Sequence, residues 1–416
     1  MSKARQLSLE LLRRVQHGAF ASNLLSKSLN EKVLTSQDKS LVTDLLYGAL
    51  RYQHYLRFRL RDYLSKADRL PEDVLNILQL GAYEILLRGT AKHAAVSEWV
   101  NLSKGNYNKL SGLVNAVLRK FESSLNPEEL KEAAKLSVPS WLFEAWQDLF
   151  GEQASDIALA MNKPEPLWLY SYHPQSKESL EAEGCQIRYS HLGGRSLGIQ
   201  SPKPLHQLRA YQEGMVQAQN PASAHIVQLL EPQKGERVLD LCSGNGIKAA
   251  QMAALGADVT SVELNESNMH KAQKNLKRLK LAVKHVVFDL QNVPGLEPST
   301  KVLLDAPCSG TGTLRGHPEI RLRLEKKDLS KFVNLQKNLL KTAATLTAPG
   351  GALVYAVCTL TKAEGLDIIE DFLQQQPNFI PQKLSLSVPH QAFELGSYIL
   401  PLEGLDGFFV SRLIRT

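Results

Sequence analysis

Apolar residues recur every three to four positions through residues 1–125. Leu41, Leu45 and Leu46 show this spacing, and residues 74–87 repeat it. Such a period gathers apolar side chains on one face of an α-helix. The pattern predicts an all-helical domain of about five or more helices.

Residues 126–232 mix the helical period with short alternating runs. Pro139 precedes an amphipathic stretch and is suited to the start of a helix. Residues 167–172 and 185–189 alternate between apolar and polar positions, which is typical of strands. We expect linker helices followed by a small α+β subdomain.

Residues 233–416 repeat the order strand, loop, helix. Short apolar runs separated by helical patterns are typical of a parallel sheet covered by helices. The chain is therefore expected to be multidomain, with a Rossmann-like α/β domain after the all-α domain and the α+β subdomain. The main expected strands are residues 237–241, 258–262, 283–288, 302–304 and 352–357.

Charge is concentrated in the helical domain. Residues 1–125 hold 19 Lys and Arg against 11 Asp and Glu, a net charge of +8, whereas the whole chain carries +7. This imbalance suggests a polyanionic partner, most simply nucleic acid, and the alternative is a solvated basic surface. One basic segment has aromatic residues between its cations, and it is either an RNA-facing helix or an ordinary amphipathic helix with its rings in the core: Arg51, Tyr52, Tyr55, Arg57, Phe58, Arg59 and Arg61.

The four cysteines are Cys185, Cys242, Cys308 and Cys358, and none forms a C-x-x-C pair. This spacing indicates neither a disulfide framework nor a zinc site, so no metal is expected. Cys185 and Cys242 are interpreted as structural. No apolar run approaches the roughly 18 residues of a membrane span. We expect a cytoplasmic, monomeric protein without a membrane partner.

Acidic residues at three strand ends suggest a nucleoside site. Asp240 lies near the end of the first strand, Glu263 ends the second, and Asp289 follows the third. A carboxylate placed like Glu263 can accept hydrogen bonds from both ribose hydroxyls, and Asp289 can lie near an adenine amino group. A small-residue loop before a helix N-terminus completes the cofactor site: Cys242, Ser243, Gly244, Asn245 and Gly246.

Two cofactors fit this layout. The pattern Gly244-x-Gly246-x-x-Ala249 satisfies the dinucleotide fingerprint, which is weak on its own. S-adenosylmethionine needs the same ribose carboxylate, and Asp240 is placed to meet its ammonium group. The two downstream cysteines favour S-adenosylmethionine, because hydride transfer has no use for them.

Cys308 and Cys358 each follow a predicted strand, and Asp305 lies beside the first of them. Cytosine C5 is a poor nucleophile, and a thiolate that adds to C6 activates it. A second group then removes the C5 proton so that the thiol can leave. Two thiols on neighbouring loops suit this chemistry.

These segments resemble known families. Asp44–Tyr52 and Val114–Arg119 are similar to NusB-type RNA-binding domains. Asp305-Ala-Pro-Cys308 and Cys358-Thr resemble the Pro-Cys and Thr-Cys motifs of RNA cytosine-5 methyltransferases. Together the resemblances cover nearly the whole chain. They point to the bacterial enzymes that methylate ribosomal RNA of the small subunit and carry a NusB-like domain, the methyltransferase B type, with domains at 1–125, 126–232 and 233–416.

The resemblance implies a role for each reactive residue. Cys358 would be the nucleophile, and Cys308 would help to release the product. Asp305 would hydrogen-bond the N3/N4 edge of cytosine, and Lys248 would lie near both the cofactor and the target base. The substrate would be 16S ribosomal RNA.

Three alternatives remain open at this stage. The first is a cytosine-5 methyltransferase that acts on transfer RNA. The second is a catalytically silent RNA-binding assembly factor, because Asn245 and Ile247 stand where the family has Pro and Gly. The third is a nicotinamide-dependent oxidoreductase.

Overall fold

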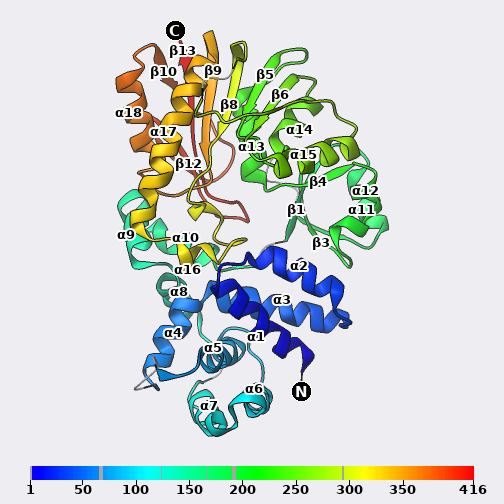
Figure 1. The fold of residues 1–416 in the computed structure, drawn as a ribbon, viewed down its shortest axis with the longest axis vertical. Coiled ribbons are helices and arrows are strands. Elements are labelled where there is room, and N and C mark those ends of the chain that lie inside the picture. The colour runs from blue at the N-terminus through cyan, green and yellow to red at the C-terminus, as the bar shows by residue number, and fades with distance from the viewer. Residues whose placement is uncertain (1, 65–68, 123, 165, 190–193, 293–294) are drawn as a thin grey trace. The chain divides into compact units, whose positions relative to one another are not determined.

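The computed structural model describes residues 2–64, 69–122, 124–164, 166–189, 194–292 and 295–416. They form two compact units, drawn in Figure 1. The first unit contains residues 1–163 and 314–324, and the second contains residues 164–313 and 325–416. The predicted domain borders at 125 and 232 are not tested by this division and stay a prediction.

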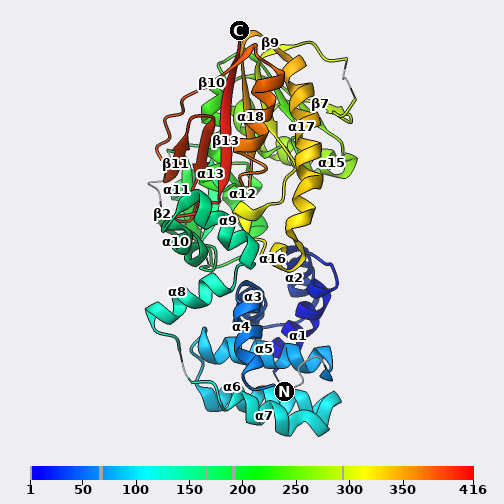
Figure 2. The same cartoon turned by 90° about the vertical axis from the view of Figure 1, so that its left-hand side faces the viewer.

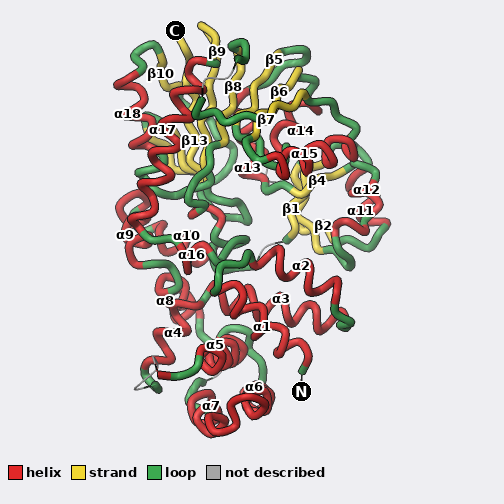
Figure 3. The backbone as a smooth tube through the Cα atoms, viewed as in Figure 1, coloured by secondary structure: helices red, strands yellow, loops and turns green. Residues whose placement is uncertain are grey.

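The described residues of the first unit form helices joined by loops, without a strand. Figure 3 draws these helices in red. This confirms the predicted all-helical domain. Helix α5 is buried on almost every side, and it contacts α1, α3, α4, α6 and α7. The helices are α1 (Lys3–Gln16), α2 (Ala21–Glu31), α3 (Ser36–Arg51), α4 (Gln53–Arg61), α5 (Glu72–Leu86), α6 (Lys92–Tyr107), α7 (Ser111–Leu118), α8 (Pro127–Leu136), α9 (Ser140–Phe150), α10 (Gln153–Ala160) and α16 (Ile320–Arg323).

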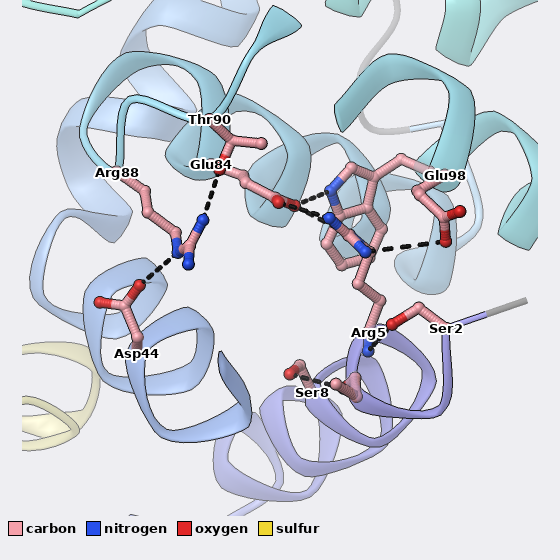
Figure 4. Close-up of polar contacts among 10 residues, drawn as sticks. Ser2, Arg5, Ser8, Asp44, Glu84, Arg88, Thr90 and Glu98 are labelled. Atoms are coloured by element: carbon pink, nitrogen blue, oxygen red, sulfur yellow. Dashed lines mark hydrogen bonds and ion pairs between the residues drawn. The ribbon is translucent and has the colours of Figure 1, made fainter. Parts of the chain in front are cut away.

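A buried carboxylate joins three helices of this unit. Glu84 on α5 is fully buried and accepts hydrogen bonds from Arg5 Nε at 3.0 Å and from Trp99 Nε1 at 2.8 Å (Figure 4). A second guanidinium nitrogen of Arg5 lies 2.5 Å from Glu84 Oε1. Since buried charges are stable only when paired, this cluster fixes α1 and α6 against α5.

The basic segment around α4 differs from an RNA-stacking surface. Tyr52 and Tyr55 are buried in the helical core, and Arg51 donates a hydrogen bond to the carbonyl of Arg315 at 3.0 Å. The RNA-facing interpretation was therefore wrong for Tyr52 and Tyr55, because their rings pack in the core and stabilise the fold. Only three members of the segment are exposed: Arg57, Phe58 and Arg61.

Residues 314–324 belong to the helical unit although they lie far along the chain. Arg321 donates to Asn162 Oδ1 at 2.6 Å and to the carbonyl of Met161 at 2.9 Å. Arg323 donates to two carbonyls at the end of α1 and the turn before α2. Burial lowers the pKa of Arg321 to about 9. The segment is thus held by the buried guanidinium of Arg321 and the partly buried one of Arg323.

The second unit begins with a small antiparallel sheet in the order β2-β3-β1-β4. The two strands expected in this region are confirmed. Leu169, Leu180 and Ile199 are among the residues of its core. The elements are β1 (Leu167–Ser171), α11 (Ser176–Ala182), β2 (Gln186–Tyr189), β3 (Ser196–Gln200), α12 (Arg209–Gln212) and β4 (Val216–Ala218).

The large sheet of this unit has the order β11-β12-β13-β9-β8-β5-β6-β7, with β10 paired to β13. The five strands β5, β6, β7, β8 and β9 pair in parallel with one another, and β13 pairs antiparallel with β9. Strand β13 also pairs with β10, and Figure 2 labels both. The strands are β5 (Arg237–Leu241), β6 (Asp258–Glu263), β7 (Lys284–Val287), β8 (Ser299–Asp305), β9 (Thr347–Val357), β10 (Phe379–Gln382), β11 (His390–Phe393), β12 (Gly396–Ile399) and β13 (Phe408–Arg415).

Two groups of helices pack on this sheet. Helix α14 contacts α13 and α15, and α17 contacts α18 (Figure 1). Both faces of the central strands are buried, which confirms the predicted Rossmann-like α/β fold. No helix within the described ranges is long and apolar enough to cross a bilayer. The helices are α13 (Pro221–Leu230), α14 (Ile247–Ala254), α15 (Glu266–Leu279), α17 (Leu329–Thr345) and α18 (Leu366–Gln375).

Candidate active site

The strand order reverses between β5 and β8. The chain runs from β5 outward through β6 and β7, and then returns to β8 on the other side of β5. Open α/β sheets bind ligands at such a switch point, beyond the carboxyl ends of the strands. A cavity of about 400 Å³ lies there, and its lining includes Cys242, Gly244, Glu263, Asn268, Phe288, Asp289, Asp305, Cys308, Leu339 and Cys358.

The loop after β5 has a left-handed backbone at several positions. Cys242 has φ of 62°, and Gly244 and Gly246 have φ of 54° and 72°. A Cβ added at Gly246 would lie 2.9 Å from the Cβ of Ala272, so this close approach to α15 requires glycine. The loop therefore turns sharply and leads into the N-terminus of α14.

Glu263 is held in place by the backbone around it. Its two carboxylate oxygens accept hydrogen bonds from the amides of Gly244, at 2.7 Å, and Asn265, at 2.8 Å. These bonds orient the carboxylate toward the cavity that it lines. A carboxylate oxygen has room for further donors, so Glu263 can also accept ribose hydroxyl groups.

Asp240 is fully buried, and neither of its carboxylate oxygens has a hydrogen-bond partner among the described residues. Burial raises the pKa of Asp240 to about 7, although the nearby Lys248 ammonium acts in the opposite direction. A buried acid without a donor requires one from elsewhere. The site is suited to a ligand that brings an ammonium group.

Lys248 on α14 connects the cofactor loop to β8. Its Nζ lies 2.5 Å from Asp305 Oδ2. Burial disfavours the ammonium, but the Asp305 carboxylate outweighs it and raises the pKa of Lys248. Asp305 lines the cavity and remains partly exposed, so the pair presents a fixed carboxylate to a ligand there.

The two predicted reactive cysteines lie together. Cys308 Sγ is 3.3 Å from Cys358 Sγ, and both residues line the cavity. The hydrogen bond to Cys358 and burial raise the pKa of Cys308 well above its usual value. Cys308 therefore stays protonated at neutral pH and can donate to Cys358.

Glu364 links the two cysteine loops. It is fully buried, and it accepts hydrogen bonds from the amide of Ser309 at 2.8 Å and from Thr359 Oγ1 at 2.9 Å. Ser309 follows Cys308, and Thr359 follows Cys358. One carboxylate thus contacts the residue next to each thiol.

A second connection uses backbone groups. The amide of Gly312 donates to the carbonyl of Cys358 at 3.0 Å, and the amide of Gly407 donates to the carbonyl of Gly312 at 2.8 Å. A Cβ at Gly312 would come within 2.0 Å of the Gly407 oxygen. The loop that carries Cys308 can approach β9 and β13 only because residue 312 is glycine.

The structure brings most of the sequence-predicted site residues into this cavity. Lys248 and Asp240 do not line it, and Ser243, Asn245 and Gly246 belong to the loop without lining it. Sequence reasoning missed several lining residues and the link through Glu364. Two of these, Leu335 and Leu339, show the helical i, i+4 spacing of an apolar face, which was the available signal. The others include Leu264, Asn265, Asn268, Phe288, Leu290 and Gln291.

Two family models match the chain. Residues 2–123 match the NusB family, and residues 227–414 match the family described as 16S rRNA methyltransferase RsmB/F. These matches agree with the resemblance seen in the sequence. They also show that the nicotinamide-dependent alternative was wrong.

Curated relatives match over the full length. The chain is 41% identical to ribosomal RNA small subunit methyltransferase B of Thermus thermophilus, over 99% of this chain and 97% of that protein. It is 31% identical to the protein of the same name from Salmonella paratyphi A, over 96% of each.

Solved structures show the same fold. The crystal structure of PH0851 has a TM-score of 0.82 at 24% identity, covering 99% of this chain and 98% of that one. NSun6 from Pyrococcus horikoshii has a TM-score of 0.60 at 18% identity, covering 67% and 98%. The chain therefore belongs to the ribosomal RNA small subunit methyltransferase B family, and it is an S-adenosylmethionine-dependent rRNA methyltransferase with a NusB domain.

Proposed function

We propose that the protein methylates C5 of a cytosine in 16S ribosomal RNA through a covalent bond between Cys358 and C6. The observation that carries this proposal is the 3.3 Å separation of two thiols that line a nucleoside-sized cavity. Methyl transfer to oxygen or to an exocyclic nitrogen needs no thiol pair, whereas C5 methylation needs a nucleophile and assistance in its release.

The residues present fit S-adenosylmethionine. Asp240 would pair with the ammonium of the methionine part, and Glu263 would accept the ribose hydroxyls. Asp289 would hold the adenine amino group, and the apolar side chains of Phe288 and Leu339 line the same cavity. When bound, the cofactor supplies an electrophilic methyl group on its sulfonium.

Cys358 attacks C6 as a thiolate, and the C5=C6 electron pair moves into the ring. Asp305, fixed by Lys248, hydrogen-bonds the N3/N4 edge and favours the protonated ring that accepts this charge. After C5 has gained its methyl group, the C5 proton passes to the Cys308 sulfur as that sulfur gives its own proton to Cys358. The C5=C6 double bond is restored, and the bond between C6 and Cys358 breaks. Cys308 assists by donating its S–H to the departing Cys358 thiolate.

The helical unit offers a surface for RNA. A hollow of about 600 Å³ beside α6 and α7 is lined by three cations, Lys92, Lys104 and Arg119, and by the amides of Asn101 and Asn115. No carboxylate is among the described residues that line it.

Several other cations of the helical unit are neutralised. Arg13 and Arg88 form ion pairs with aspartates, and Lys32 pairs with Glu10. The cations of the hollow have no such partner within the described part of the chain. Unpaired cations that surround a hollow are suited to RNA phosphates.

Transfer of labelled methyl from S-adenosylmethionine to unmodified 16S rRNA and to transfer RNA, followed by nucleoside analysis, tests the proposal. We expect label in 5-methylcytidine of 16S rRNA only. Label in transfer RNA alone would favour the alternative substrate. Cofactor binding without methylation of free rRNA or of partly assembled small subunits would favour a catalytically silent assembly factor.

A further inference from the structure

Glu364 has an unusual environment for a carboxylate. It is fully buried, and no cation contacts it within the described residues, yet both of its oxygens accept several hydrogen bonds. The five donors are the Ser309 amide at 2.8 Å, Ser309 Oγ at 2.5 Å, Thr359 Oγ1 at 2.9 Å, Thr361 Oγ1 at 2.9 Å and Gln336 Nε2 at 3.0 Å.

These donors come from three separate segments. Ser309 lies on the Cys308 loop, Thr359 and Thr361 follow the end of β9, and Gln336 lies on α17. Gln336 Nε2 also donates to the carbonyl of Pro307, which precedes Cys308. Hydrogen bonds to a charged group are stronger than neutral ones, so a buried carboxylate holds these segments more firmly than an amide or a hydroxyl would.

We propose that Glu364 is a positioning residue that sets the distance between Cys308 and Cys358. It does not line the cavity, so it acts through the loops and not on the substrate. The two cysteine loops are 50 residues apart in sequence, and they meet at the carboxylate. This positioning role depends on the proposed function only in the experiments that measure methyl transfer.

The thiol distance can be tested without any RNA. Phenylarsine oxide bridges two thiols that are held close together, forming two As–S bonds with release of water. Intact mass and titration should show one bridge in the wild type, and none after Cys308→Ala. Glu364→Ala and Glu364→Gln should both weaken this bridging by about tenfold or more, because Ala removes both acceptor oxygens and Gln replaces one of them with a donor.

Activity gives the second measurement. Glu364→Gln should lower kcat by about 100-fold, because displacement of a reacting group by about 1 Å has such an effect. The Kd for S-adenosylmethionine should stay within about twofold, since Glu364 does not contact its proposed site. Glu364→Asp, which keeps the charge, should recover part of the arsenical bridging and part of kcat.

Glu84→Gln provides the matched control, since it neutralises an equally buried carboxylate in the helical unit. It should leave arsenical bridging unchanged. If Glu364→Ala fails to fold, Glu364→Gln and Ser309→Ala give the same test. Wild-type bridging and kcat in folded Glu364 variants would overturn the proposal. Weakened bridging, together with a wild type that methylates no cytosine, would support the positioning role and reject the proposed function.

Discussion

Lys248 Nζ lies 2.5 Å from Asp305 Oδ2, which joins the helix after the cofactor loop to the strand that leads into the Cys308 loop. Lys248→Met should release the Asp305 carboxylate from its fixed position and lower kcat by about 100-fold or more. Single-turnover methyl transfer measures this loss. Lys248→Arg keeps a cation and should retain more activity than Lys248→Met; equal activity of all three proteins would contradict the role of the pair.

We expect Asp240 to make cofactor binding dependent on pH. Burial raises the pKa of Asp240 to about 7, so the acid is largely protonated below that pH and cannot pair with an ammonium group. Affinity for S-adenosylmethionine should fall as the pH drops from 8 to 6. Asp240→Asn should bind about 10- to 100-fold more weakly at pH 8 and lose this pH dependence. Calorimetry at several pH values measures both effects.

The same residue should destabilise the ligand-free protein. In the unfolded chain the pKa of an Asp is near 3.9, so the folded protein binds the Asp240 proton more tightly than the unfolded chain does. The free energy of unfolding therefore falls as the pH rises from about 4 to 7. Ligand-free Asp240→Asn should therefore be more stable than the wild type at pH 8, by up to about 4 kcal/mol. Thermal unfolding should show the difference shrinking toward pH 4; a less stable variant at pH 8 would contradict the unpaired carboxylate.

The cysteines should respond in opposite ways to substitution. Cys358→Ala should abolish methyl transfer and any covalent protein–RNA adduct, because no other thiol attacks C6. Cys308→Ala should accumulate the adduct, since the release of Cys358 is no longer assisted. Denaturing electrophoresis with labelled RNA separates the two outcomes. Cys185→Ala is the control. An adduct in Cys358→Ala but not in Cys308→Ala would make Cys308 the nucleophile and Cys358 the residue that assists release.

The hollow beside α6 and α7 should contribute to RNA affinity. Combined alanine substitution of Lys92, Lys104 and Arg119 should weaken RNA binding and reduce the slope of log K against log salt by about 2 to 3. Alanine at Arg14 and Lys32, which already face Glu10, is the matched control and should change the slope little. An unchanged slope in the triple variant would place the RNA contact elsewhere.

Glu84 should be important for the stability of the helical unit. Glu84→Ala leaves Arg5 and Trp99 without their acceptor and should lower the free energy of unfolding by about 3 to 5 kcal/mol. Glu98→Ala removes a partly exposed carboxylate that also pairs with Arg5 and should change it by less than about 1 kcal/mol. Urea unfolding followed by circular dichroism compares the two variants.

The sequence predicted those parts of the site that depend on strand ends. Asp240, Glu263, Asp305 and the two cysteines follow buried apolar runs, and parallel strands bring such positions to one edge of a sheet. The helical period predicted the first domain in the same way. The apolar run before a strand end and the helical period can each be recognised within one short segment of the sequence.

The remainder depended on contacts between distant segments. Tyr52 and Tyr55 lie in a segment of alternating arginines and aromatic residues, which is typical of an RNA-binding surface. Only tertiary packing shows that these two tyrosines are core residues. Glu364 lies six residues after Cys358, but its contacts depend on Ser309, 55 residues earlier, which no local pattern shows. Helical spacing alone could not show that residues 314–324 belong to the first unit.

That last segment has a consequence for synthesis on the ribosome. The helical unit needs residues 314–324, so it cannot be completed when its first 163 residues have emerged. Until then, the carbonyls that receive Arg321 and Arg323 must be satisfied by water. Most of the strands of the large sheet's parallel part are translated during this interval. The helical unit is therefore expected to reach its final structure only after much of the second unit has been synthesised.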